Sequence, residues 1–348
     1  MRCPTLIDLP PPPPEKKGWP WDEESSPIFR NVCGLDEFPL ISIVTPSLDQ
    51  EQYIEETIRS VLLQGYPNIQ YIIIDGGSKD KSLEIIRKYE HWIDYWVSEP
   101  DNGQSHAINK GFTKASGQLF AYINSDDLYE PNAFYSVAIH FLRNNDLQLI
   151  AGKCVVFNEK STKRIFKPWW PKSLSYFIKK TYSSTFAQPS SFWTRHIYLK
   201  AGEIDQSLHF CFDREFFLRL GLLGVRPLFI GSTLSRFREH ANSKTVSNPV
   251  EFQRESISIL EKYSQTCGIP NWKTAKWKKR MENEIEYSEV FSSWKKEGRL
   301  KAIKIFLRMI LKTPSLMLER KILGQARRLF TFSEKDVNEL IGYKGHLH

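Results

Sequence analysis

Short apolar runs alternate with helix-patterned segments along the first half of this chain, and this alternation restricts the possible folds more than any other feature of the sequence. The runs are residues 40–45 (LISIVT), 69–74 (IQYIII) and 119–123 (LFAYI). Such short runs, bounded by proline, glycine or polar residues, are typical of buried strands. Apolar residues at helical spacing follow the first two runs, in residues 53–64 and 81–89. A strand–helix–strand–helix order predicts an α/β fold with a mostly parallel sheet.

Each predicted strand ends in polar residues that include a carboxylate. They are Asp49 after the first strand, Asp75 at the end of the second, and Asn124, Ser125, Asp126 and Asp127 after the third. The carboxyl ends of parallel strands meet at one edge of the sheet, where open α/β folds bind ligands. Oxygen ligands of this kind suit Mg²⁺ or Mn²⁺, and such a cation would bind a diphosphate. The alternative is turn and capping chemistry, for which Asp, Ser and the sequence DGGS are well suited.

A further polar loop, residues 99–104 (EPDNGQ), precedes a predicted helix at residues 105–113. Asp101, Gln104 and Asn109 are the polar groups there with reach to a nucleotide sugar, and capping or solvent exposure is the alternative for each. No GxGxxG sequence follows the first strand, which argues against a dinucleotide-binding fold and a dehydrogenase.

Four motifs, in their order and spacing, resemble those of family 2 glycosyltransferases with the GT-A fold. The motifs are residues 46–49 (PSLD), 72–82 (IIIDGGSKDKS), 98–111 (SEPDNGQSHAINKG) and 122–127 (YINSDD). The resemblance covers about residues 38–245. It implies a mostly parallel central sheet flanked by helices. It also implies transfer of a hexosyl group from a nucleotide-diphospho-sugar.

The resemblance assigns three sets of donor-side residues. Nucleotide-binding residues are Pro46, Ser47, Asp49, Asp75, Gly76, Gly77, Ser78, Gln104, Asn109 and Ser125. Asp126 matches the second acid of the family's DxD motif and is the expected metal ligand, together with His240. Asn124, Asp127 and Arg238 are expected at the donor sugar and diphosphate. Asn124 replaces the first acid of DxD, and its neutral amide oxygen is a weaker metal ligand.

Residues 210–219 (FCFDREFFLR) begin a helix that is apolar nearly all round and therefore buried. Asp213 lies at its start, where capping alone would explain a carboxylate. The resemblance instead implies a general base at this place, and we expect Asp213 to be that base. Phe212 departs from the family pattern, which often has an acid there. Glu215 supplies the later acid and is the alternative base, while its neighbours favour a position on the helix exterior or beside an arginine. Glu215 and Trp193 are expected on the acceptor side. The segment 163–180 is rich in aromatic residues, including Trp169, Trp170, Tyr176 and Phe177. These side chains could either stack on an acceptor sugar or pack on the core.

Arg238 and His240 alternate in a predicted extended segment, so their side chains should project to one face. Arginine neutralises phosphate, and histidine can ligate a transition metal or donate to phosphate. Residues 238–245 follow the pattern RxHxxSxT, which resembles the C-terminal metal or diphosphate motif of the same family.

The positive charge of the chain is confined to its last part. Residues 251–348 contain 20 Lys and Arg against 12 Asp and Glu, whereas the preceding residues contain 28 of each. A neutral front part argues against a nucleic-acid groove there. Near the end, Ala302, Ile303, Phe306, Met309 and Ile310 line one face of a predicted helix, and Lys301, Lys304, Arg308 and Lys312 line the other. A second amphipathic helix is predicted at residues 316–330.

Two interpretations of these basic helices stay open. They could pack on the catalytic domain or on a second subunit, which would make a homodimer. They could instead adhere to an anionic membrane surface, as cationic amphipathic helices do.

The predicted domains are an irregular proline-rich arm at residues 1–38, a GT-A domain at 39–248 and a basic helical extension at 249–348. Trp19 and Trp21 should fix the arm on the main domain, because exposed tryptophan is costly. No apolar run reaches the roughly 18 residues of a membrane span, and no signal pattern begins the chain. Five scattered cysteines without a CxxC pair favour a reducing, cytoplasmic location, with peripheral contact at the inner membrane face as a further expectation.

The predicted function is that of an inverting, metal-dependent glycosyltransferase acting on a polysaccharide, glycan or lipid-linked acceptor. Asp213 would take the proton of an acceptor hydroxyl, while Mn²⁺ or Mg²⁺ and Arg238 or His240 stabilise the departing nucleoside diphosphate. UDP is favoured as the nucleotide through the resemblance alone. One rival is a nucleotidyltransferase, which would need a basic, glycine-rich loop where residues 46–50 read PSLDQ. Another is a sugar-nucleotide-binding scaffold without catalysis.

Overall fold

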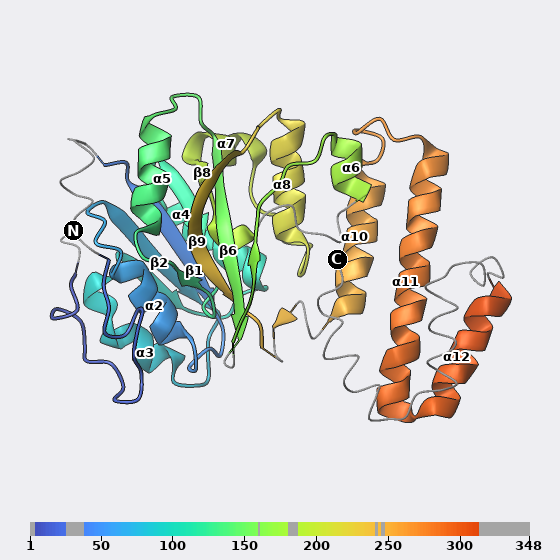
Figure 1. Ribbon diagram of the computed structural model, residues 1–348, viewed down its shortest axis with the longest axis horizontal. Helices are drawn as coiled ribbons and strands as arrows, with labels where there is room; N and C mark the ends of the chain where they lie inside the picture. Colours follow the sequence, from blue (N-terminus) through green and yellow to red (C-terminus); the bar gives the residue numbers. More distant parts are fainter. Residues whose placement is uncertain are drawn as a thin grey trace. The chain divides into compact units, whose positions relative to one another are not determined.

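The computed structural model describes residues 4–25, 38–158, 161–179, 187–240, 243–244 and 248–312 (Figure 1). The chain divides into two compact units. The first consists of residues 1–174 and 184–240, and the second of residues 175–183 and 241–348.

The first unit is built on a nine-stranded sheet with the order β3-β2-β1-β4-β8-β6-β9-β5, in which β7 also pairs with β6. The strands are β1 (Ile41–Ser47), β2 (Ile69–Asp75), β3 (Tyr95–Ser98), β4 (Leu119–Tyr122), β5 (Leu128–Tyr129), β6 (Leu149–Asn158), β7 (Ser161–Phe166), β8 (Ser191–Thr194) and β9 (Leu228–Arg238). Strands β3, β2, β1 and β4 are parallel to one another, whereas β8 is antiparallel to both β4 and β6. The predicted α/β fold is confirmed, and the sheet as a whole is mixed.

Helices cover both faces of the parallel strands. They are α2 (Ile54–Leu62), α3 (Ser82–Lys88), α4 (Gln104–Lys114), α5 (Ala133–Leu142), α7 (Arg195–Ala201) and α8 (Phe212–Leu222), with short 3₁₀ turns at Glu90–Trp92 and Gln188–Ser190. Ile41 and Ile43 belong to the same core cluster as α2 and α3. Val44 points the other way toward α4, where a Cβ on Gly111 would lie 2.3 Å from its Cγ1. Successive side chains of β1 therefore point to opposite faces of the sheet and pack in the apolar layers on either side of it, as expected for a strand.

The strand register brings the polar loops together. Ser47 at the end of β1 pairs with Asp75 at the end of β2, and Asp75 pairs with Ser98 at the end of β3. Tyr122, the last residue of β4, pairs with Val44. The loops after these four strands therefore meet at one edge of the sheet.

The proline-rich arm packs on the first unit, as the two tryptophans predict. Trp19 and Trp21 are buried, and the indole Nε1 of Trp19 donates to the carbonyl of Tyr129 at 2.8 Å. Arg59 of α2 is fully buried beneath the arm. Its guanidinium donates to the carbonyls of Pro20 (3.0 Å), Pro10 (2.9 Å) and Trp21 (2.8 Å). The arm is thus tied to the helix that borders the predicted donor site.

Substituting Arg59 with methionine should lower the free energy of unfolding by roughly 3–5 kcal/mol, because three backbone carbonyls lose a charged donor. Chemical denaturation of the full chain measures this loss. Arg87→Met on α3 is the matched control, since Arg87 is exposed. Equal stability of the two variants would show that the arm contributes nothing to folding.

The second unit contains α10 (Pro249–Tyr263), α11 (Asn271–Glu297) and α12 (Arg299–Lys312), and α6 (Leu174–Lys179) begins at the boundary of the units. Helices α10, α11 and α12 lie side by side in Figure 1. Gly298, with φ +88°, allows the reversal between α11 and α12. The amphipathic helix predicted around residues 301–312 is confirmed, and the one predicted at 316–330 lies outside the described residues. Within the described part of the chain, every helix is too short or too polar to cross a membrane.

Candidate active site

The loop after β2 is organised by the buried carboxylate of Asp75. Its Oδ2 accepts the N–H groups of Gly77 (3.0 Å) and Ser78 (2.9 Å) and the hydroxyl of Ser98 (2.7 Å). Its Oδ1 accepts the Ser78 hydroxyl. Asp75 is fully buried, so in this structure it shapes the DGGS loop from inside. A direct contact of Asp75 with a base stays a prediction.

The local geometry favours glycine at both positions of the DGGS loop. Gly77 has φ +87°, which side chains rarely adopt. A Cβ on Gly76 would lie 2.7 Å from Oδ2 of Asp101 in the loop after β3. The loops after β2 and β3 therefore pack closely, which brings two predicted nucleotide-binding segments together.

The loop after β1 contains two features typical of a ligand site. Asp49 has φ 50°, a left-handed conformation that is uncommon outside glycine. Its backbone N–H donates to Ser78 Oγ (2.8 Å), and its Oδ1 accepts the N–H of Lys79 (2.7 Å). Ser47 Oγ, at the end of β1, is buried and has no hydrogen-bond partner among the described residues. A buried unpaired hydroxyl is costly, so this oxygen is suited to meet a polar ligand.

The turn after β4 explains why asparagine stands first in the NSDD motif. Asn124 Oδ1 accepts the side-chain amide of Gln104, the first residue of α4, at 2.6 Å. Asn124 Nδ2 donates to Asp127 Oδ2 at 3.3 Å. An aspartate at position 124 could not donate, and its charge would repel Asp127. The amide therefore links α4 to the turn, and Gln104 and Asn124 are brought together as the motif order suggests.

Asp127 faces the interior, and this corrects the expectation that it contacts the donor sugar. It is fully buried, and its Oδ1 accepts the backbone N–H of Arg238 in β9 at 2.9 Å. Burial and the neighbouring charge of Asp126 raise the pKa of Asp127 well above its usual range, against the opposing effect of Arg238. Asp127 therefore joins the turn to β9.

Asp126 meets both basic residues predicted near it. His240 Nε2 lies 2.9 Å from Asp126 Oδ2, and the His240 ring packs on Tyr53 at 4.9 Å between centroids. Arg238 donates from Nε to the backbone carbonyl of Asp126 (3.0 Å) and pairs with Glu56 of α2 (2.7 Å). Arg238 is buried, so its contacts hold the turn from the protein interior. His240 lies instead at the side-chain carboxylate of Asp126.

The donor atoms of Asp126 and His240 suit a divalent cation. A carboxylate oxygen and an imidazole nitrogen are both ligands of Mn²⁺ and related ions. The two side chains are 22% and 12% exposed, so an ion could reach them from solvent. Nowhere in the described ranges do three or more His, Cys, Asp or Glu side chains gather as a metal site. The pair therefore fits a cation whose other ligands come from a diphosphate and water.

The structure places Asp213 near the same end of β4. It lies in the first turn of α8, whose N-cap is Cys211, and its Oδ1 accepts the N–H of Arg214 at 2.8 Å. The adjacent Phe212 packs on Tyr122, the last residue of β4, at 6.4 Å between ring centroids. Burial and the charges of Asp213 and Asp127 raise the pKa of Tyr122. The first turn of α8, which contains Asp213, therefore lies at the strand end that carries the NSDD turn.

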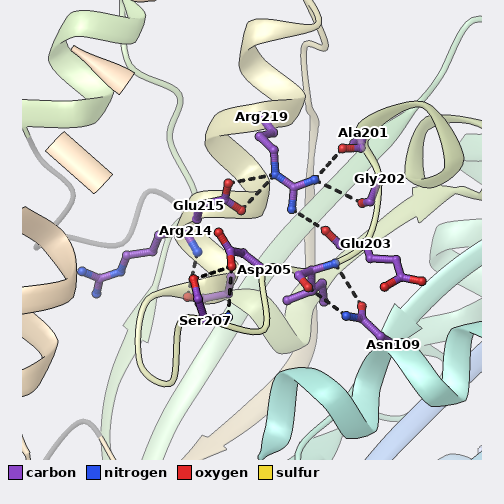
Figure 2. Close-up of polar contacts among 11 residues, drawn as sticks. Asn109, Ala201, Gly202, Glu203, Asp205, Ser207, Arg214, Glu215 and Arg219 are labelled. Atoms are coloured by element: carbon purple, nitrogen blue, oxygen red, sulfur yellow. Dashed lines mark hydrogen bonds and ion pairs between the residues drawn. The ribbon is translucent and has the colours of Figure 1, made fainter. Parts of the chain in front are cut away.

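Arg219 of α8 pairs with Glu215 of the same helix and links α8 to the end of α7 (Figure 2). Glu215 is 1% exposed, and both its oxygens accept Nε of Arg219, at 3.0 and 2.9 Å. The same guanidinium donates to the carbonyls of Ala201, Gly202 (3.1 Å) and Glu203 (2.8 Å), which follow the last turn of α7. The expectation that Glu215 contacts an acceptor is therefore corrected: its carboxylate is used inside the protein.

Replacing Glu215 with alanine should destabilise the protein by about 3–5 kcal/mol, because Arg219 would keep a partly buried, uncompensated charge. The KM for the acceptor should stay unchanged in the folded fraction. Denaturation curves and acceptor titrations separate these effects. Glu203→Ala is the control, since the Glu203 side chain is exposed and only its carbonyl takes part. If Glu215→Ala raised the KM for the acceptor and left the stability unchanged, Glu215 would contact the acceptor after all.

Two further predicted contacts are also corrected. Asn109 exchanges hydrogen bonds with the backbone of Ile204, at 2.8 Å to the carbonyl and 2.9 Å from the N–H (Figure 2). It therefore anchors the segment that leads to α8 and does not lie at the nucleotide loops. Trp193 is 0% exposed and packs between Phe216 (5.1 Å) and Phe112 (5.9 Å), so it belongs to the core.

The sequence patterns missed the part that α2 plays. Glu56 pairs with Arg238, and Thr57 Oγ1 donates to the carbonyl of Asp127 at 2.8 Å. Tyr53, which precedes α2, packs on His240. A signal was present in Thr57, a polar residue inside the apolar face of the helix. Helical spacing alone does not indicate which loop such a residue contacts.

Comparison with known proteins agrees with this site. Residues 42–202 match the family model "Glycosyl transferase family 2". An uncharacterised glycosyltransferase of Rickettsia typhi is 27% identical over 221 residues, which cover 61% of this chain and 69% of that protein. The predicted resemblance to family 2 glycosyltransferases is confirmed over residues 42–202, so the chain contains a glycosyltransferase domain.

Two solved structures share the fold at low identity. One is S. aureus TarS, residues 1–349, in complex with UDP-GlcNAc, with a TM-score of 0.52 and 14% identity over 78% of this chain and 79% of that one. The other is the mannosyltransferase PcManGT of Pyrobaculum calidifontis in complex with GDP-Man and Mn²⁺, with a TM-score of 0.52 and 13% identity over 95% and 90% of the two chains. The predicted GT-A fold is confirmed.

Proposed function

We propose that this glycosyltransferase moves a sugar, with inversion, from a UDP-sugar to an acceptor hydroxyl, with the help of a divalent cation. One observation carries the proposal. The Asp126–His240 pair and Asp213 come from three segments that are far apart in the sequence, and Phe212, the neighbour of Asp213, packs on the last residue of β4, beside the turn that carries Asp126. A donor diphosphate beside the pair and an acceptor beside Asp213 would lie at the same strand end.

The nucleotide would be bound by the loops after β1, β2 and β3. Ser47 offers an unpaired hydroxyl, and Asp49 and the DGGS loop provide a rigid frame that side chains do not crowd. Gln104 and Asn124 connect this frame to the NSDD turn. Uracil is proposed as the base because the fold neighbour TarS was solved with UDP-GlcNAc, whereas GDP is the alternative that PcManGT suggests.

Asp126 and His240 would hold the divalent cation, which supplies positive charge to the diphosphate when it is bound. Arg238 keeps the turn in place through Glu56 and the carbonyl of Asp126, and it adds positive potential close to that carboxylate. Preorganised charge of this kind stabilises a departing nucleoside diphosphate.

Asp213 would act as the general base. Its carboxylate accepts the proton of the acceptor hydroxyl as that oxygen attacks the anomeric carbon from the face opposite the leaving group. A single displacement of this kind inverts the anomeric configuration and needs no covalent sugar–enzyme intermediate. The ion pair of Glu215 and Arg219 keeps α8, and with it Asp213, in position.

The acceptor is proposed to be a polysaccharide, glycan or lipid-linked sugar. The proposed catalytic domain spans residues 39–248, between the arm and the helical extension at 249–348, and the proposed location is the cytoplasm.

A screen of sugar nucleotides tests the proposal on the full chain. UDP-hexoses, GDP-mannose and dTDP-glucose are compared for thermal stabilisation and for hydrolysis, with and without Mn²⁺. A UDP-sugar should give the largest cation-dependent stabilisation together with slow release of UDP. Stabilisation without turnover on any donor or acceptor would favour a binding protein without catalysis, and release of pyrophosphate would indicate nucleotidyl transfer.

A further inference from the structure

Helix α12 in the second unit has two different apolar faces. Ala302 and Phe306 are 0% and 3% exposed and form the inner face, which packs toward α11. Leu300, Leu307 and Leu311 are 84%, 50% and 79% exposed. With about 3.6 residues per turn, these three leucines fall on one stripe opposite Ala302 and Phe306. We call this stripe the leucine face.

The helix that carries the leucine face is strongly basic. Residues 299–312 contain five Lys and Arg and no Asp or Glu. Lys301, Lys304 and Arg308 are exposed and lie beside the leucine face, at i+1, i+4 and i+8 from Leu300. Lys301 is paired with Glu297 of α11, so its charge is partly balanced. The surface therefore combines apolar side chains at its centre with cations along one edge.

We infer that the leucine face docks on the surface of an anionic lipid bilayer. The leucines would enter the boundary between headgroups and acyl chains, and Lys304 and Arg308 would lie at the lipid phosphates. This arrangement of apolar centre and cationic edge is what a helix lying in a membrane interface requires. A second copy of the chain is a poorer occupant, because a symmetric dimer through this face would bring the same cations together. The inference concerns the second unit alone and does not depend on the proposed reaction.

Co-sedimentation of the full chain with vesicles tests this inference. The parent should sediment with vesicles of phosphatidylcholine and phosphatidylglycerol, not with phosphatidylcholine alone, and high salt should weaken the binding. The triple variant Leu300→Ser, Leu307→Ser, Leu311→Ser should bind the anionic vesicles at least about tenfold more weakly. Leu199→Ser is the matched control, because Leu199 is 64% exposed on α7 of the first unit. Circular dichroism confirms that the exposed substitutions leave the fold intact.

Three results would overturn the inference. The first is a parent that ignores anionic vesicles at low salt, and the second is a triple variant that binds them as the parent does. The third is a parent dimer, seen by light scattering, that the triple variant converts to monomers, because the leucine face would then contact a second copy. Cation-dependent stabilisation by UDP-sugars should be equal in parent and triple variant. A failed vesicle experiment is thus distinct from a failed transferase assignment.

Discussion

Asp126→Ala should reduce sugar transfer by about 10²–10³-fold, because the carboxylate that lies 2.9 Å from His240 at the NSDD turn is lost. The same variant should lose the extra thermal stabilisation that Mn²⁺ gives in the presence of UDP. His240 would keep its packing on Tyr53, and Arg238 would keep its bond to the backbone carbonyl of residue 126, so the turn should stay folded. Initial rates and melting curves over a Mn²⁺ titration measure both effects.

Asp146→Ala is the matched control for this experiment, since Asp146 is an exposed acid of the same unit. It should leave the rate and the Mn²⁺ response unchanged. An Asp126→Ala variant with parental rates and an undiminished Mn²⁺ response would remove the cation from the proposed mechanism. That result would leave the proposed nucleotide-binding role of the loops after β1 and β2 unchanged, because the conformation of the DGGS loop depends on the hydrogen bonds between Asp75 and Ser78.

Asp213→Asn should lower the rate of transfer by about 10²–10⁴-fold while donor binding stays within experimental error of the parent. The amide is nearly isosteric and can still accept the N–H of Arg214, so α8 should keep its first turn. It cannot take a proton from an acceptor hydroxyl at neutral pH. Single-turnover rates with saturating donor, together with calorimetric binding of UDP, separate catalysis from binding.

Glu203→Gln, on the exposed surface near α8, is the control for Asp213→Asn. Full activity of Asp213→Asn would show that another group takes the proton. Loss of UDP binding together with activity would mean that Asp213 supports the donor site. Neither result would change the assignment of the chain to the glycosyltransferases, which rests on the family match.

The parts of this fold that could be predicted from sequence are those that local patterns determine. Strands β1, β2 and β4 were predicted because short apolar runs end abruptly at proline, glycine or acidic residues. The meeting of their loops followed from the rule for parallel strands, and the register of Ser47 with Asp75 agrees with it. The proximity of Asp126 and His240, 2.9 Å apart, agrees with the resemblance of residues 238–245 to the family's C-terminal metal or diphosphate motif.

The errors share a physical cause, which is that burial is decided by distant partners. Trp193 and Asn109 are residue types that often bind sugars, yet each is enclosed by segments far from it in the sequence. Glu215 is neutralised by Arg219, whose other bonds go to the end of α7. Asp127 was expected to face the donor, but it accepts a backbone N–H from β9. Arg219 stands in the same motif as Glu215, whereas the partners of Trp193, Asn109 and Asp127 cannot be read from the motifs in which those residues stand.

Helix α2 has a consequence beyond the catalytic motifs. On one side its Arg59 binds three carbonyls of the N-terminal arm, and on the other its Thr57 and Glu56 bind the Asp127 carbonyl and Arg238. The arm, the helix and the acidic turn therefore form one cooperative element, in which loosening any member relaxes the others. A substitution that detaches the arm from Arg59 should therefore also disturb the turn that carries Asp126, although the two are far apart in the sequence.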